Sequence, residues 1–269
     1  MLETLKKEWE AKIILGLFLL YVAWWVYMQV ALPHDHILYA LYGQSYGVIA
    51  LVGGIWGLFV ARKWGGFKSV MGKAIIMFSL GLFAQEFGQM AYTYYIFIEH
   101  IEIPYPSIGD IGFFGTIPFY IYGAYLLAKA SGVKISLRSF GNKLQAILIP
   151  VVMVGVSYIL FLRNYQLDFS HPLKSFLDFG YPLGQAIYVS IAIFTYVATR
   201  KLLGGIMRPK ILVILFAFVA QFLSDYSFIY FQDKYYPGHF IDLVYTTSYM
   251  IMAIGILELK TVYNQLHRG

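Results

Sequence analysis

The chain alternates between long apolar stretches and short polar segments. Eight apolar stretches are long enough to cross the hydrocarbon core of a bilayer, which takes about 20 helical residues. They cover residues 13–32, 37–61, 74–98, 108–128, 144–162, 175–199, 211–232 and 239–258. The polar segments between them are too short to hold a soluble domain. The pattern therefore predicts an all-α integral membrane protein with eight transmembrane helices.

The segments that flank these stretches are short. Residues 1–12 place several charges around Trp9, which predicts a helix lying at the membrane interface. We expect the transmembrane domain to cover residues 13–262 and a tail to cover residues 263–269. The first apolar stretch is too long for a signal peptide and lacks a small-residue cleavage site, so we expect it to be retained.

The positions of the charges add an orientation to this picture. Charged residues make up 13% of the chain, against about 25% in soluble domains. All but three of the 20 lysines and arginines lie in the N-terminal segment, in alternate loops or at the C-terminus; the exceptions are Arg163, Lys174 and Lys234. This asymmetry predicts a multi-pass protein of the cytoplasmic membrane with both termini in the cytoplasm.

Composition and motifs exclude several functions. The net charge of +6 is explained by topology and by contact with the lipid bilayer, and no basic surface rich in aromatics indicates a nucleic-acid partner. The chain has no cysteine, which excludes disulfides, thiolate metal sites and a cysteine nucleophile. It also lacks a phosphate-binding loop, a dinucleotide fingerprint and a serine-hydrolase elbow. A non-enzymatic role is therefore favoured.

Parts of the sequence resemble one another. "YPSIGDIGFFGTIPFYIY" at 105–122 and "PLKSFLDFGYPLGQAIYV" at 172–189 share Ser-x-x-Asp-x-Gly followed by aromatics, a proline and a tyrosine. "AQEFGQMAYTYY" at 84–95 similarly matches "AQFLSDYSFIYF" at 220–231. These matches predict that helix pairs 3–4, 5–6 and 7–8 are copies of one helical hairpin.

Three carboxylates occur early in predicted helices, at the outer membrane boundary: Asp110, Asp178 and Asp242. An acid in the first turn stabilises a helix because the unpaired N–H groups there carry partial positive charge. Ser107 and Ser175 precede two of these acids by three residues, as in a capping box. The alternative is a ligand-binding or proton-binding role.

A second polar group lies inside two predicted spans. Its members are Glu86, Gln85 and Gln89 in the third span, and Gln221 and Asp225 in the seventh. An acid inside a bilayer is costly and normally faces a partner in the bundle interior, but no lysine or arginine lies mid-span. These residues therefore either join helices by hydrogen bonds or form a site for a ligand, a proton or a cation.

The histidines are a third candidate group. Five of the six are expected at the outer side: His34, His36, His100, His171 and His239. Imidazoles with nearby carboxylates are the ligands that zinc or copper accepts. The spacing matches no known metal motif, so the alternative is a set of polar loop residues.

The order of the motifs resembles the multi-helix membrane sensor domain found at the N-terminus of bacterial and archaeal diguanylate cyclases, cyclic-di-GMP phosphodiesterases and sensor histidine kinases. The motifs are "LGLFAQEFGQMAYTYY", "PYPSIGDIGFF", "YPLGQ" and "YYPGHFIDLVY", within residues 74–258. The resemblance implies a membrane-embedded sensory or ligand-binding module. Two features depart from the family: Gln185 stands where the family has an acid, and we expect the module to act without an output domain of its own.

Three functional hypotheses follow. The first is a sensory module that binds a lipidic or small-molecule ligand and acts through a separate cytoplasmic or membrane signalling protein. The second is a membrane-embedded hydrolase in which the outer histidines hold zinc or copper. The third is a proton-coupled transporter of small molecules with a mid-membrane acid.

Overall fold

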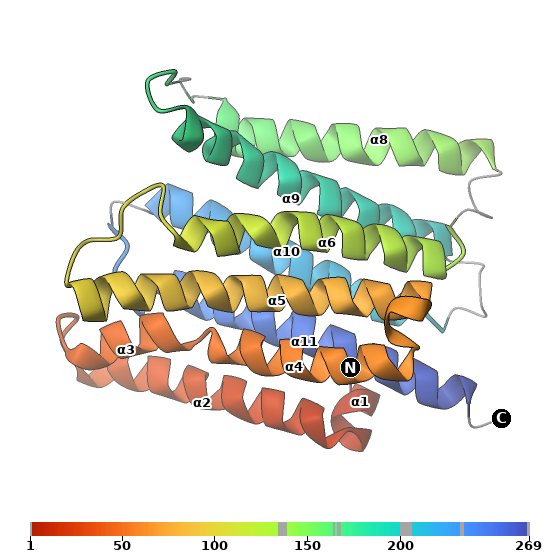
Figure 1. Ribbon diagram of the computed structural model, residues 1–269, viewed down its shortest axis with the longest axis horizontal. Coiled ribbons are helices and arrows are strands. Elements are labelled where there is room, and N and C mark those ends of the chain that lie inside the picture. The colour runs from red at the N-terminus through yellow and green to blue at the C-terminus, as the bar shows by residue number, and fades with distance from the viewer. Residues whose placement is uncertain are drawn as a thin grey trace.

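The computed structural model describes residues 2–133, 139–163, 165, 168–199, 206–231 and 234–267. These residues form a bundle of long helices that run up and down in sequence order, without strands (Figure 1). Eight helices are long and apolar enough to cross a membrane. The predicted all-helical, multi-pass architecture is confirmed. The internal repeat and the orientation of the termini stay predictions.

Ten α-helices are described. They are α1 (Leu2–Lys7), α2 (Trp9–Ala31), α3 (Ile37–Ser45), α4 (Val48–Lys63), α5 (Val70–Tyr94), α6 (Gly109–Ala130), α8 (Phe140–Ser157), α9 (Pro172–Ala198), α10 (Arg208–Phe231) and α11 (Phe240–Leu266). Short turns of other helical types follow α4, α5 and α8, at Gly66–Lys68, Tyr95–Glu99 and Tyr158–Leu162.

The bundle has two distinct ends. One end carries α1 and the end of α11, and we call it the terminal end (right in Figure 1). The opposite end carries the connections that follow α2, α5, α8 and α10, and we call it the histidine end. It includes the five histidines singled out in the sequence, because each of them lies in or beside one of these connections.

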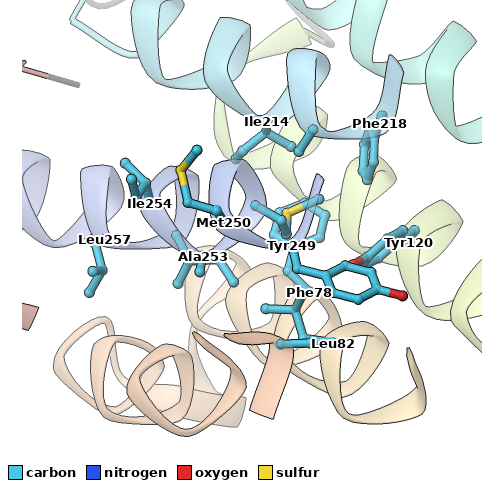
Figure 2. Packing of buried hydrophobic residues seen from close by; sticks show 14 of the residues in the cluster. Phe78, Leu82, Tyr120, Ile214, Phe218, Tyr249, Met250, Ala253, Ile254 and Leu257 are labelled. Carbon is cyan, nitrogen blue, oxygen red and sulfur yellow. The ribbon is translucent and has the colours of Figure 1, made fainter. Parts of the chain in front are cut away.

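The last helix, α11, is at the centre of the packing. It packs mainly against α10, α4 and α2, and 67% of its most apolar stretch is buried. Figure 2 shows the core that it shares with α5, α6 and α10. The labelled side chains are Phe78, Leu82, Tyr120, Ile214, Phe218, Tyr249, Met250, Ala253, Ile254 and Leu257.

Helix α8 is the opposite case. Only 6% of its most apolar stretch is buried, and its main partner is α9. It lies at the edge of the bundle, far from α2 (Figure 1). In a membrane its apolar surface contacts lipid, so this helix contributes little to the interior.

The second span is interrupted. The sequence predicts one helix over 37–61, but α3 ends at Ser45 and α4 begins at Val48. The amide of Ile49 donates to the carbonyl of Tyr46 at 3.2 Å, a bond over three residues that tightens the turn. A tightened turn inside a long helix is typical of a hinge. Its contacts with α5 are described below.

The N-terminal segment also differs from expectation. The single helix predicted over residues 1–12 is in fact two, because α1 ends at Lys7 and α2 begins at Trp9. Helix α1 is attached to α11, since the Thr4 hydroxyl donates to Glu258 at 2.7 Å. We call the polar contacts around it the terminal clasp. Its members are Thr4, Glu8, Glu10, Lys210, Glu258, Lys260 and Thr261.

The clasp contains ion pairs that connect α10 and α11 with the start of α2. Lys210 of α10 pairs with Glu258 of α11. Lys260 of α11 pairs with Glu8 at 2.5 Å and with Glu10 at 2.6 Å. The chain ends are therefore held together through α11. Breaking a buried pair leaves an uncompensated charge, which normally costs about 3–5 kcal/mol.

Close backbone contact between α5 and α6 gives a test of this packing. A Cβ atom at Gly112 would lie 2.4 Å from the carbonyl oxygen of Ala84 and 2.7 Å from the amide nitrogen of Gly88. We expect Gly112→Ala to push the helices apart and to destabilise the protein by about 1–3 kcal/mol. Thermal unfolding in detergent measures this. Gly115→Ala is the control, because nothing lies within 4 Å of its Cβ position; equal midpoints for the two variants would contradict the packing.

Candidate functional site

Asp225 is the centre of a polar site inside the bundle. Its carboxylate accepts hydrogen bonds from the Tyr245 hydroxyl on α11 and from the Gln185 amide on α9. The Gln221 amide, one turn earlier on α10, lies 3.3 Å and 3.5 Å from its two oxygens. Three helices thus direct neutral donors at one carboxylate. Because each partner is on a different helix or turn, the site depends on how these helices pack.

Further hydrogen bonds extend this site toward α5. The Ser248 hydroxyl donates to the Gln221 carbonyl oxygen at 2.9 Å. The Tyr249 hydroxyl donates to the carbonyl oxygen of Gln85 at 2.9 Å. The sequence match between Gln85 and Gln221 thus corresponds to a shared role, since both accept a bond from neighbouring residues of α11.

The contacts continue to the interruption between α3 and α4. The Gln89 amide donates to the Tyr46 hydroxyl at 2.6 Å. The Tyr46 ring stacks on the rings of Tyr245 and Tyr249, with centroids 6.5 Å and 5.9 Å away. We call the whole set the interior network. It consists of Tyr46, Gln85, Gln89, Gln185, Gln221, Asp225, Tyr245, Ser248 and Tyr249.

Glu86 lies beside the interior network but is not hydrogen-bonded to it. Its side chain packs over Gly47, where a Cβ atom would come within 2.1 Å of the Glu86 Oε2 atom. That oxygen is buried, and no hydrogen-bond partner for it is found among the described residues. The acid therefore faces the tightened turn between α3 and α4. Only glycine leaves room for it there.

Two of the three boundary carboxylates bind backbone amides at helix starts. Asp110 accepts from the amide of Ser107 at 2.7 Å, just before α6 begins. Asp242 accepts from the amide of Gly238 at 2.7 Å, just before α11 begins. Both bonds reach back from the first turn, as in a capping box.

Asp178 does not have this role. The predicted capping box of Ser175 and Asp178 is wrong, because α9 begins earlier, at Pro172. The Ser175 hydroxyl instead donates to the Asp168 carbonyl at 2.8 Å. Asp178 accepts from the hydroxyls of Tyr105 at 2.6 Å and Tyr165 at 2.8 Å.

Tyrosine bonds also connect the boundary acids of α6 and α9. Tyr181 of α9 donates to Asp110 of α6 at 2.8 Å, while Tyr105, just before α6, donates to Asp178 of α9. The exchange is reciprocal and fixes the two helix starts against each other. Asp242 also has a tyrosine partner, because the Tyr235 hydroxyl donates to it at 2.9 Å.

The five histidines separate into different environments. His34 stacks on Tyr236 with ring centroids 4.4 Å apart, and His239 meets the same tyrosine edge-on at 5.1 Å. His36 caps α3 by accepting from the amide of Leu38. The remaining two, His100 and His171, lie in other connections of the histidine end.

Neighbouring groups and burial shift the pKa values of three side chains at the histidine end. Hydrogen bonds from Ser170 and His171 lower the pKa of Asp168 to about 2. Burial, with a smaller contribution from His34, lowers the pKa of His239 below its usual value. Burial also raises the pKa of Tyr235, helped by the neighbouring Asp242.

No group of three or more histidine, aspartate or glutamate side chains with metal-site geometry occurs in the described ranges. The histidine pair at Tyr236 has no carboxylate hydrogen-bonded to it in those ranges. The zinc or copper site expected from His34, His36, His100, His171 and His239 therefore has no support among the described residues and stays a prediction. The hydrolase hypothesis stays a prediction as well.

Four members of the interior network were not singled out from the sequence as site residues: Tyr46, Tyr245, Ser248 and Tyr249. Helical spacing contains a signal for two of them, since Tyr245 and Tyr249 lie three and seven residues after Asp242, on one face of α11. Gln185 was noted only as a departure from a family motif. In the fold its amide donates to the Asp225 carboxylate.

Comparison of the chain with family models, with curated proteins and with solved structures found no match. The arrangement of the site itself is therefore the basis for a functional proposal.

The Asp225–Tyr245 bond can be tested by removing one atom. We expect Tyr245→Phe to destabilise the protein by about 1.5–3 kcal/mol, because a buried carboxylate loses a donor. Thermal unfolding in detergent reports the change. Tyr122→Phe is the matched control, since Tyr122 is half exposed on the outside of α6; an unfolding midpoint for Tyr245→Phe equal to that of the control would refute the bond.

Proposed function

We propose that the protein is an integral-membrane sensory module. It binds a small ligand in the interior network and acts on a separate partner protein at the terminal end. In this proposal the terminal end faces the cytoplasm, which agrees with its lysines and arginines. The resemblance of residues 74–258 to membrane sensor domains supports the same class.

The observation that carries this proposal is the double role of α11. Near the histidine end, α11 supplies Tyr245, Ser248 and Tyr249 to the interior network. Near the terminal end, the same helix supplies Glu258 and Lys260 to the terminal clasp. One continuous helix thus joins the polar site to the contacts that hold α1.

A change at Asp225 has a direct route to α11. Asp225 bonds to Tyr245, and Gln221, its neighbour on α10, bonds to Ser248. A ligand or a proton that alters the carboxylate changes which of these bonds form. Packed helices respond to such changes by shifts of about 1–2 Å. If α11 shifts along its axis as a rigid helix, Glu258 and Lys260 shift with it, so the contacts of the terminal clasp change as well.

We expect Asp225→Asn to move α1 relative to α11. The chain has no cysteine, so Lys7→Cys and His267→Cys can carry spin labels without removing native thiols. Both positions are exposed and lie outside the clasp. Pulsed electron resonance in lipid nanodiscs then measures the distance between the labels. Asp225→Asn should shift this distance by about 1–2 Å or broaden its distribution.

Asp178→Asn is the control for this measurement. It neutralises an acid of the histidine end that has no contact with the interior network. The control should leave the label distance unchanged. If Asp225→Asn also leaves it unchanged, the network and the clasp are not coupled and the sensory proposal fails.

The role of a partner has its own test. A photo-crosslinking residue at Lys7 in native membranes should capture one protein, and Asp225→Asn should change the yield of that adduct. The same crosslinker at Phe169, an exposed residue at the histidine end, is the control. An adduct that forms equally from both positions, or that ignores Asp225→Asn, contradicts signalling through the terminal end.

One observation favours a proton-coupled transporter as a second candidate. Transporters often bind ions where a membrane helix is interrupted, and Glu86 faces the turn between α3 and α4 with an unpaired oxygen. For this role, liposomes containing the protein must show proton flux along a pH gradient, reported by an internal pH-sensitive dye. Glu86→Gln should abolish the flux and Asp178→Asn should not.

A further inference from the structure

The site around Asp225 contains a buried polar atom without a hydrogen-bond partner among the described residues, on the side chain of Gln185. Gln185 is 3% exposed, and its amide nitrogen donates to the Asp225 carboxylate. Its carbonyl oxygen, Oε1, is buried and has no hydrogen-bond partner among the described residues. A buried amide oxygen without a donor costs about 1–3 kcal/mol. The side chain that binds the carboxylate is therefore itself incomplete.

The carboxylate also lacks a counter-charge. Its described hydrogen-bond partners are Gln185, Gln221 and Tyr245, all of them neutral. No ion pair with Asp225 occurs among the described residues. An isolated carboxylate in a low-dielectric interior is strongly disfavoured unless a positive charge or a proton joins it.

The groups that face Asp225 do not supply this charge. Helix α9 presents Tyr181 and Tyr188, and α11 presents Tyr245 and Tyr249. On its own helix, α10, the neighbour is Gln221. None of these side chains carries a positive charge.

We propose that Asp225 and Gln185 bind one small hard cation, either a proton or Na⁺. Such a cation neutralises the carboxylate and prefers oxygen ligands, which the carboxylate, the Gln185 amide oxygen and the Tyr245 hydroxyl provide. The site has a single carboxylate, so it lacks the charge that divalent cations normally require. The proposal deepens the sensory function, because it names the ligand of the interior network.

The packing restricts the ligand to this size. Gln185, Gln221 and Ser248 are all at most 5% exposed. Two surface hollows occur elsewhere, one lined by residues such as His100, Glu102 and Tyr235, the other by residues such as Trp9, Trp56 and Lys260. No member of the interior network lines either of them. Asp225 keeps some accessible surface between the helices, which suits a single ion.

A proton and Na⁺ would bind different atoms of this site. A proton binds one carboxylate oxygen of Asp225, so a donor to that oxygen must turn away or become an acceptor. Because the terminal amide torsion of glutamine is soft, Gln185 can make this change at little cost. Na⁺ instead needs the Gln185 carbonyl oxygen as a ligand, so the Gln185 amide is essential for sodium and secondary for the proton.

The test measures thermal unfolding of the full chain in lipid nanodiscs. Samples contain NaCl or choline chloride at equal ionic strength, over a series of pH values. The variants are Asp225→Asn, Gln185→Met and the control Asp178→Asn. A bound ligand raises the unfolding midpoint by mass action, and we expect a rise of about 2 °C or more in the wild type.

Two results support the proposal and separate the sources. If Na⁺ is the ligand, NaCl raises the midpoint over choline chloride in the wild type and the control, and both Asp225→Asn and Gln185→Met abolish the rise. If a proton is the ligand, the midpoint ignores sodium, and its pH dependence is smaller in Asp225→Asn than in the control. An infrared carboxylic-acid band that titrates in the wild type and is absent in Asp225→Asn then accompanies it.

Two results overturn the proposal. One is a wild type whose midpoint and carboxyl band respond to neither Na⁺ nor pH. The other is Asp225→Asn responding to both as the control does. These failures differ from failure of the sensory function, which is decided by the label distance between positions 7 and 267. If the label distance changes but the midpoint and the carboxyl band respond to no ion, only the cation proposal is rejected. If they respond to an ion but the label distance does not change, only the signalling proposal is rejected.

Discussion

The hydrogen bond from a tyrosine hydroxyl to a carboxylate is the interaction on which this bundle depends. Asp110 accepts from Tyr181, and Asp178 accepts from Tyr105 and Tyr165. The same pairing joins Asp225 to Tyr245 and Asp242 to Tyr235. Asp225 lies mid-span, where the chain carries no lysine or arginine, so this acid needs a neutral donor. Tyrosine suits this because its ring packs in an apolar environment while its hydroxyl reaches a polar partner. These five of the chain's 24 tyrosines thus have a structural role beyond the membrane interface.

The fold could be predicted from sequence because hydrophobicity in a membrane protein is a local property. Each span can be recognised from its own length and composition, and the structure contains eight helices long and apolar enough to cross a membrane. The division of the second span into α3 and α4 could not be predicted in this way. A window of about 20 residues averages over the short polar run at residues 44–47, so hydropathy reports a single span. The turn there is stabilised by contacts with other helices, such as the bond from Tyr21 to the carbonyl of Ser45.

The candidate site could be predicted only in part, for a related reason. An acid or an amide within an apolar stretch is conspicuous, so Gln85, Gln221 and Asp225 were visible. Their tyrosine partners were harder to identify. Tyrosine is common throughout the chain, and the spacing of Tyr245 and Tyr249 on α11 does not show which residues of other helices they contact. The histidines are the opposite case. Their number and their nearby carboxylates suggested a metal site, but they lie in separate connections. Among the described residues, His34 and His239 contact one tyrosine, Tyr236.

The central position of α11 has a consequence for how the protein is made. The helix that completes the interior leaves the ribosome after the other seven spans. Until it arrives, Asp225 lacks Tyr245, Lys210 lacks Glu258, and α2 lacks a main packing partner. Before α11 is inserted, the other seven spans therefore lie in the bilayer without their central helix, and their polar side chains face lipid or one another. The interior can therefore be completed only after these seven spans have been inserted.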